Sequence, residues 1–192
     1  MCFSKIASVL TRMFTEERLI DNEDQDLYEY ALFNILSYLF FLTLAMLVGF
    51  MLGMFFESVL FFVSFCLVRN FAGGIHADTE RKCTIVSTFS IITSIVVIRV
   101  LDFFGLKTFS LFLLVISTIC LIVLSPIDTP NKKLSDSEKK KYKKKTVLIC
   151  LVLVMLHIIL LCVEIHSFAI AVSVSMVFAA ALVVAGKIEQ VA

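Results

Sequence analysis

The chain has 192 residues, of which 60% are hydrophobic, and a formal net charge of +1. Soluble domains of this size are nearer half apolar, and here the excess lies in long uncharged runs. The composition therefore excludes an ordinary soluble protein and indicates one membrane-embedded domain over residues 1–192. The six cysteines form neither a CxxC pair nor a Cys/His cluster with zinc spacing. No disulfide framework, metal or cofactor is expected.

Residues 1–27 precede the first apolar run and are predicted to form an amphipathic helix followed by an acidic connector. Phe3, Ile6 and Met13 fall on one side of a helix over residues 1–20, and the charged side chains fall elsewhere. Such a helix either lies on the membrane surface or packs against the rest of the protein. Both alternatives remain open at this point.

Six transmembrane helices are expected from the uncharged runs that follow. A crossing of ~30 Å of hydrocarbon takes about 20 helical residues. Residues 31–68 fit two crossings if a turn lies between Val48 and Glu57, and residues 84–98, 108–125, 146–163 and 167–186 form four more. Pro126 and Pro130 break the helix after the fourth span, and residues 126–145 are interpreted as a basic loop. The predicted fold is an all-α integral membrane protein.

The orientation follows from the preference of Lys and Arg for short cytosolic loops. If the N-terminus is inside, every Lys and Arg except Arg99 and Lys107 faces the cytosol. Both termini are then cytosolic. The segment from Arg69 to Cys83 and the basic loop then share the cytosolic side.

The segment 69–83 is a polar island in the apolar first half of the chain, and it holds Gly73-Gly74, His76 and Cys83. A thiol close to an imidazole is the minimum for a cysteine nucleophile with its base. A histidine and a cysteine between two spans can also be incidental. The glycines, which permit a sharp backbone conformation and close approach of a substrate chain, the polar surroundings of His76, and the two cations before Cys83 favour the catalytic alternative.

Helix geometry constrains how the pair can work. Seven residues on one helix would separate His76 and Cys83 by ~10.5 Å along its axis, so the third span should begin at Asp78 or Thr79, which are good N-caps. Cys83 then lies early in that helix, where the helix N-terminus and neighbouring cations stabilise an anion such as a thiolate. Asp78 could instead complete a triad. Arg69 is either an interfacial anchor or a residue that binds a carboxylate or orients the loop.

The spacing Arg69-x-x-x-Gly73-Gly74-x-His76, followed by six residues and Cys83, resembles the signature of the accessory gene regulator B (AgrB) family. These are membrane-embedded cysteine endopeptidases of Gram-positive quorum sensing. The segment 125–133 resembles the proline- and lysine-containing loop of the family, and the order of spans and loops matches over about residues 28–186. The resemblance implies that His76 and Cys83 are catalytic and that Arg69 and Gly74 support activity.

The resemblance also implies a substrate, a small precursor similar to AgrD with an acidic C-terminal tail. The enzyme would remove the tail, leave an acyl-thioester on Cys83, and pass the acyl group to an internal Cys or Ser, which closes a thiolactone or lactone ring. It further implies a homodimer. Membrane lipid is an expected partner, and nucleic acid is not.

Eight lysines between Lys132 and Lys145 present a dense positive field that would attract an acidic tail. The candidate substrate-binding residues are Lys132, Lys133, Lys139, Lys140 and Lys141. The lysines could instead only set topology and contact anionic lipid.

The competing class is a non-enzymatic transporter or export helper, which should show charged or broken helices at mid-membrane and an internal repeat. His157, near the middle of the fifth span, is the one residue that fits this class. An interhelical hydrogen bond is the preferred role for it.

Overall fold

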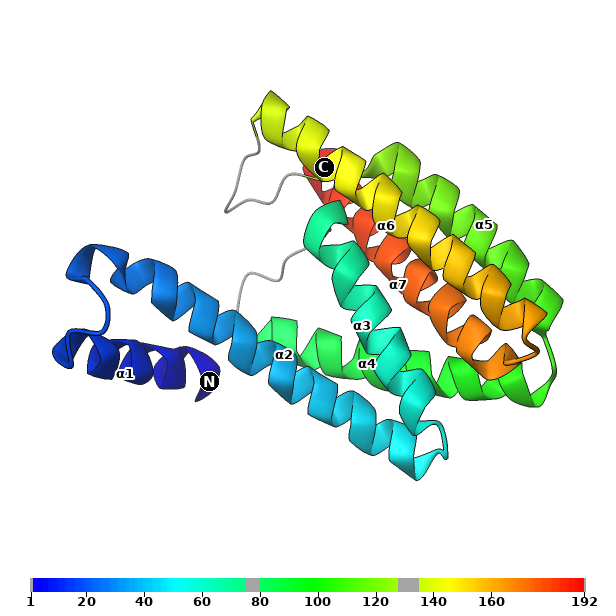
Figure 1. Ribbon diagram of the computed structural model, residues 1–192, viewed down its shortest axis with the longest axis horizontal. Helices are drawn as coiled ribbons and strands as arrows, with labels where there is room; N and C mark the ends of the chain where they lie inside the picture. Colours follow the sequence, from blue (N-terminus) through cyan, green and yellow to red (C-terminus); the bar gives the residue numbers. More distant parts are fainter. Residues whose placement is uncertain (1, 75–79, 128–134, 192) are drawn as a thin grey trace.

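The computed structural model describes residues 2–74, 80–127 and 135–191, and within these ranges the chain forms helices and turns without a strand (Figure 1). The long helices are α1 (Cys2–Glu16), α2 (Gln25–Met51), α3 (Phe55–Ala72), α4 (Glu80–Phe103), α5 (Lys107–Leu124), α6 (Asp136–Cys162) and α7 (His166–Val191). A short 3-10 helix, Asn22–Asp24, joins α1 to α2. The helices α2 to α7 are each long and apolar enough to cross a membrane. The expected all-helical fold is confirmed, and the six helices long and apolar enough to span a membrane agree in number with the six expected spans.

The centre of the bundle is α7, which contacts α3, α4, α5 and α6. Every residue from 169 to 176 is buried, and alanines and serines alternate with larger side chains along this stretch. Apolar burial gives little driving force between helices in lipid, so small residues that allow close packing decide which helices associate. The sequence Ala169-Ile170-Ala171-Val172-Ser173 therefore explains why α7 is surrounded by other helices.

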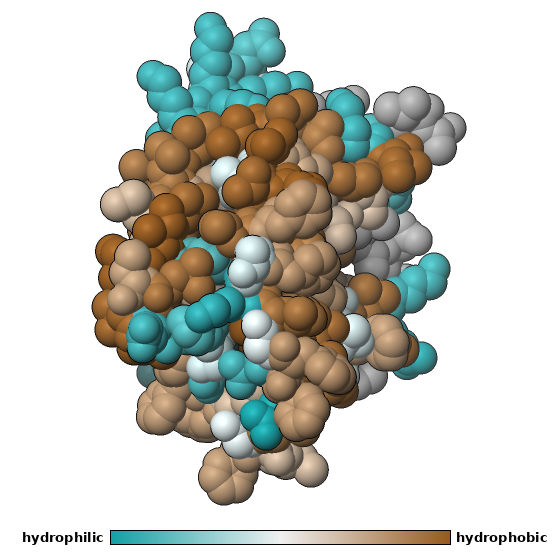
Figure 2. Space-filling model, turned by 90° about the vertical axis from the view of Figure 1, so that its right-hand side faces the viewer, coloured by the Kyte–Doolittle hydropathy of each residue, from teal (hydrophilic) through white to brown (hydrophobic). Residues whose placement is uncertain are grey.

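The outer surface of the bundle suits a lipid environment. Figure 2 shows a face dominated by hydrophobic side chains, with one group of hydrophilic side chains at the top, the end where α6 begins, and a second group across the middle. On α5, Phe112 and Ile119 are 59% and 58% exposed. Large apolar side chains left exposed in this number would be costly in water, so the chain is a multi-pass membrane protein.

The helix α1 packs against α2 at the N-terminal side of the bundle. Ala7 and Thr11 are buried, and the ring of Phe3 lies 5.2 Å from that of Phe40 on α2. The apolar side chains of Val9 and Met13 remain more than half exposed. The helix thus packs through one face and keeps an apolar stripe on another, so its position on a membrane surface stays a prediction.

His157 is buried in α6, and its Nδ1 donates a hydrogen bond to the carbonyl of Ala169 on α7, 2.8 Å away. This is the interhelical contact that the sequence favoured over a transport role.

Two segments expected as loops are partly helical. In the segment 69–83, α3 continues to Ala72 and α4 begins at Glu80. The prediction of a loop up to Lys145 is wrong from Asp136 onward, where α6 begins. Ser135 and Glu138 form a capping box there, with Ser135 N–H donating to Glu138 Oε2 over 2.9 Å. Lysine and glutamate are good helix formers, and the missing apolar period concealed the helix.

Candidate active site

The candidate site is built on the C-terminal end of α3. The helix closes with a hydrogen bond from Gly73 N–H to the carbonyl of Arg69 at 3.2 Å. The chain then leaves the helix with φ values of +78° at Gly73 and +133° at Gly74. L-residues with a side chain rarely adopt this region, so the Gly-Gly pair allows the sharp exit from α3.

Both glycines also lie against the backbone of other segments. A Cβ at Gly73 would lie 2.6 Å from the carbonyl oxygen of Ile127, and one at Gly74 would lie 3.1 Å from both Arg69 Nη1 and the carbonyl oxygen of Leu182 on α7. The sequence predicted that these glycines let a substrate chain approach closely, and that stays a prediction. In the structure the segments against them are the protein's own backbone, on both sides of the exit from α3.

The segment after α5 is bonded to the C-terminal end of α3. Ile127, which is 4% exposed, donates its N–H to the carbonyl of Ala72 over 3.1 Å. The Gly73-Gly74 segment therefore runs between Ile127 and α7, and its path is set by backbone contacts from two directions.

Arg69 is the electrostatic centre of the site. Its guanidinium interacts electrostatically with Cys83 on α4, Tyr38 on α2 and Cys66 on α3. The hydroxyl of Tyr38 donates to Asn70 Oδ1 over 2.7 Å and joins α2 to the end of α3. The guanidinium on α3 is thus within electrostatic reach of a phenol on α2 and of thiols on α3 and α4.

Cys83 is the fourth residue of α4 and is half-buried, and Arg81 and Lys82 beside it are exposed. The expectation that Cys83 lies early in the third span is confirmed. His76 and Asp78 lie outside the described residues, as do Lys132 and Lys133. The pairing of His76 with Cys83, and the role of Asp78, stay predictions.

The basic start of α6 lies next to the end of α3. The ring of Tyr142 is 6.0 Å from that of Phe71, and Lys145 Nζ lies 4.8 Å from the centre of the Phe71 ring. Lys140 and Lys141 are exposed and Lys139 is partly buried on the same part of the helix. The structure therefore brings these candidate substrate-binding lysines to the end of the bundle that holds Arg69 and Cys83.

Sequence reasoning missed the Tyr38–Asn70 bond between α2 and α3 and the packing of Tyr142 on Phe71. It counted Lys143 only among the basic residues and missed its contact with the end of α5. The amine of Lys143 donates to carbonyl oxygens of Ile122, Val123 and Ser125 at the end of α5. A signal for Lys143 was present, because Pro126 has no N–H to offer the carbonyl of Ile122.

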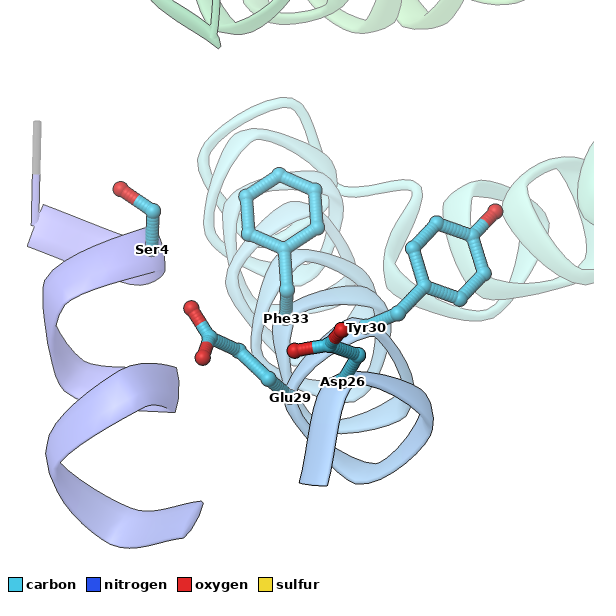
Figure 3. Close-up of a pocket in the computed structure, with 5 residues that line it drawn as sticks. All are labelled: Ser4, Asp26, Glu29, Tyr30 and Phe33. Carbon is cyan, nitrogen blue, oxygen red and sulfur yellow. The ribbon is translucent and has the colours of Figure 1, made fainter. Parts of the chain in front are cut away.

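A hollow of about 450 Å³ lies elsewhere, between α1 and the start of α2 (Figure 3). Its lining is Ser4, Asp26, Glu29, Tyr30 and Phe33. Its lining residues carry carboxylates, aromatic rings and the hydroxyl of Ser4, but no thiol or imidazole, so the hollow lacks the pair that a cysteine nucleophile with a histidine base needs.

Comparison with known proteins identifies relatives of the chain. The family model for accessory gene regulator B matches residues 4–184. A Clostridium perfringens strain 13 protein named "Putative AgrB-like protein 2" is 26% identical over 143 residues, and a strain SM101 protein named "Putative AgrB-like protein" is 22% identical over 148 residues. Each match covers 70% of this chain, and the chain spans 65% of the length of each relative. No solved structure matches.

Proposed function

The chain belongs to the accessory gene regulator B (AgrB) family, and from that premise we propose that it is a membrane-embedded cysteine endopeptidase that matures a quorum-sensing peptide. The observation that carries the proposal is the setting of Cys83. Its half-buried thiol lies in the first turns of α4, interacts with Arg69, and follows the constrained Gly73-Gly74 exit from α3. Within residues 2–74, 80–127 and 135–191, this region alone combines residues of the family motif with a thiol near a cation.

In the proposed reaction the sulfur of Cys83 attacks the carbonyl carbon of the scissile bond, while His76 accepts the thiol proton. The C–N bond then breaks, and His76 returns the proton to the leaving amine of the tail. The product of this half is an acyl-thioester on Cys83. A Cys or Ser inside the precursor attacks the thioester next, Cys83 leaves with a proton, and the ring closes as a thiolactone or lactone.

The energetics favour a site that holds the acceptor and limits water. Forming a thioester from a peptide bond is uphill, whereas transfer to a substrate thiol exchanges one thioester for another. Attack by water would be downhill and final. Holding the acceptor near Cys83 is equivalent to an effective concentration of ~10⁵ M or more in favourable cases, and exclusion of water protects the intermediate. The half-buried position of Cys83 supports this arrangement.

Substrate selection is proposed to depend on the basic start of α6. The lysines at the start of α6, of which Lys145 lies over the ring of Phe71, give a positive field beside the end of α3. An acidic tail would be drawn there, together with Lys132 and Lys133 of the adjoining segment, and salt would screen the attraction. Arg69 is proposed to stabilise the thiolate and to support the loop. The site faces the cytosol in this proposal, and two copies of the chain associate.

The test is the cleavage of a precursor by purified enzyme in lipid. We expect Cys83→Ala to abolish cleavage, and a variant that keeps Cys83 as its sole cysteine to stay active. His76→Ala should be inactive while inserting normally. Mass spectrometry of the product identifies the ring, because a macrocycle has the mass of the linear acid minus one water.

Cleavage by Cys83→Ala would disprove the mechanism. The precursor for this test keeps its internal nucleophile. If its main product is still the linear acid, the protein is a simple protease and the proposed ring closure is wrong. Export of an already mature peptide by Cys83→Ala would favour the non-enzymatic alternative of an export helper.

A further inference from the structure

The end of α5 has two carbonyl groups whose ordinary helical partners are lost. The last carbonyls of a helix need donors from outside it. The carbonyl of Ile122 would pair with the N–H of residue 126, but that residue is Pro126, which has none. The carbonyl of Val123 would pair with the N–H of Ile127, but that group donates to Ala72 instead. The turn after α5 therefore needs donors from elsewhere.

Lys143 supplies these donors from α6. Its Nζ lies 2.8 Å from the carbonyl oxygen of Ser125 and 3.5 Å from that of Val123, and it also donates to Ile122. An ammonium has three N–H donors, and its charge lies at the negative end of the α5 dipole. Carbonyls left without donors next to hydrocarbon are costly, so Lys143 replaces the two lost partners and stabilises the turn.

The turn held by Lys143 connects to the exit of α3. Ile127 is buried beneath it, bonds to Ala72, and has its carbonyl oxygen against Gly73. Gly73 begins the segment that leads to Cys83. An uninterrupted set of contacts therefore runs from Lys143 through Ser125 and Ile127 to Gly73. The contacts of Tyr142 and Lys145 with Phe71 also hold the start of α6 against the end of α3.

We propose that Lys143 is a positioning residue for the acyl transfer at Cys83, holding the 125–127 turn against Gly73 and so fixing the C-terminal end of α3, which carries Arg69. The proposal rests on the proposed function for its kinetic consequence. It separates Lys143 from Lys140, Lys141 and Lys144, whose exposed amines would act on an acidic substrate through the positive field alone.

The experiment compares Lys143→Met with Lys144→Met, which removes the same charge from an exposed position one residue away. A displacement of about 1 Å at a reacting group can cost ~10²-fold in rate, so we expect Lys143→Met to lower kcat by about 10- to 100-fold. Its change in KM should be no larger than that of Lys144→Met, because both variants lose one positive charge. Lys144→Met should instead raise KM at low salt and leave kcat as it is. Lys143→Gln, which keeps N–H donors on a shorter side chain, should recover part of the lost kcat.

A second readout needs no substrate. With Cys83 as the sole cysteine, the rate of its alkylation by a maleimide in detergent reports the environment of the thiol. Lys143→Met should change this rate at least threefold, and Lys144→Met should not. If no precursor is cleaved by the wild-type protein, the proposed function fails while the alkylation rates still decide the role of Lys143. Equal alkylation rates, or a change in KM alone for Lys143→Met, would overturn the proposal.

Discussion

Replacing Gly73 with alanine tests whether the close approach of backbone at the end of α3 organises the site. Gly73 has a φ of +78°, and an added Cβ would lie 2.6 Å from the carbonyl oxygen of Ile127. Ordinary contacts of this kind begin near 3.4 Å. The methyl group must therefore push Ile127 away, and the hydrogen bond from Ile127 N–H to Ala72 would lengthen from its 3.1 Å.

The loss of unfolding free energy expected for Gly73→Ala has two parts. Gly73 has φ +78° and ψ −150°, a region essentially confined to glycine, and holding an alanine there costs about 1–3 kcal/mol. Weakening the Ile127–Ala72 hydrogen bond costs about 1 kcal/mol more. The expected loss of unfolding free energy for Gly73→Ala is therefore about 2–4 kcal/mol. A displacement of the segment before Cys83 should also lower the rate of precursor cleavage by ~10²-fold.

The matched control is Gly105→Ala in the turn between α4 and α5. Gly105 has a φ of +64°, and a Cβ there would meet nothing within 4 Å. This variant carries the conformational cost alone, about 1–2 kcal/mol, and should cleave at the wild-type rate. Denaturation by SDS in mixed micelles measures the stability of both variants, and single-turnover cleavage measures their activity.

If Gly73→Ala loses no more stability than Gly105→Ala, the close contact of Gly73 with Ile127 does not stabilise the protein. Cleavage by Gly73→Ala at the wild-type rate would likewise contradict the prediction, because the backbone contact would then have no consequence for the site.

Two further predictions concern the basic residues. Four lysines of α6 are to be changed to Gln together, namely Lys139, Lys140, Lys141 and Lys144. The field they create should then weaken, so KM for a precursor with an acidic tail should rise roughly tenfold at low salt and return towards the wild-type value in high salt or with an uncharged tail. An identical KM for both tails would leave these lysines a topological role only. For the orientation, single cysteines in a cysteine-free background are probed in intact cells at Arg81, Ser137, Lys107 and Val163. The first two should resist a membrane-impermeant thiol reagent and the last two should react, and labelling of Arg81 from outside would contradict the arrangement.

Local patterns were enough to predict the spans. The helices α3, α5 and α7 begin and end within a few residues of the uncharged runs, because a stretch of about 20 apolar residues has no better environment than lipid and a helix satisfies its own backbone there. The turn predicted between Val48 and Glu57 occurs between Met51 and Phe55. The motif around Cys83 could also be recognised from the sequence, because its residue types and spacing are local features. The match to the family model agrees with the resemblance that this motif suggested.

The continuation of α6 into the lysine-rich segment was predicted wrongly. The apolar period that indicates a buried helix face is absent from residues 136–145, and a solvated helix of lysines does not produce one. The capping box of Ser135 and Glu138 was the local signal that could have corrected the prediction.

The sequence by itself determined an all-helical membrane chain with a polar, thiol-bearing island, because hydropathy and motif spacing act over short stretches of chain. Only the tertiary structure decided what surrounds that island. Gly73 lies against Ile127, Arg69 interacts with Tyr38 and Cys83, and the amine of Lys143 lies on the end of α5. These contacts join residues far apart in the chain, and no periodicity encodes them. They depend on which helix ends meet when the small-residue faces of α7 pack, and that is a property of the whole bundle.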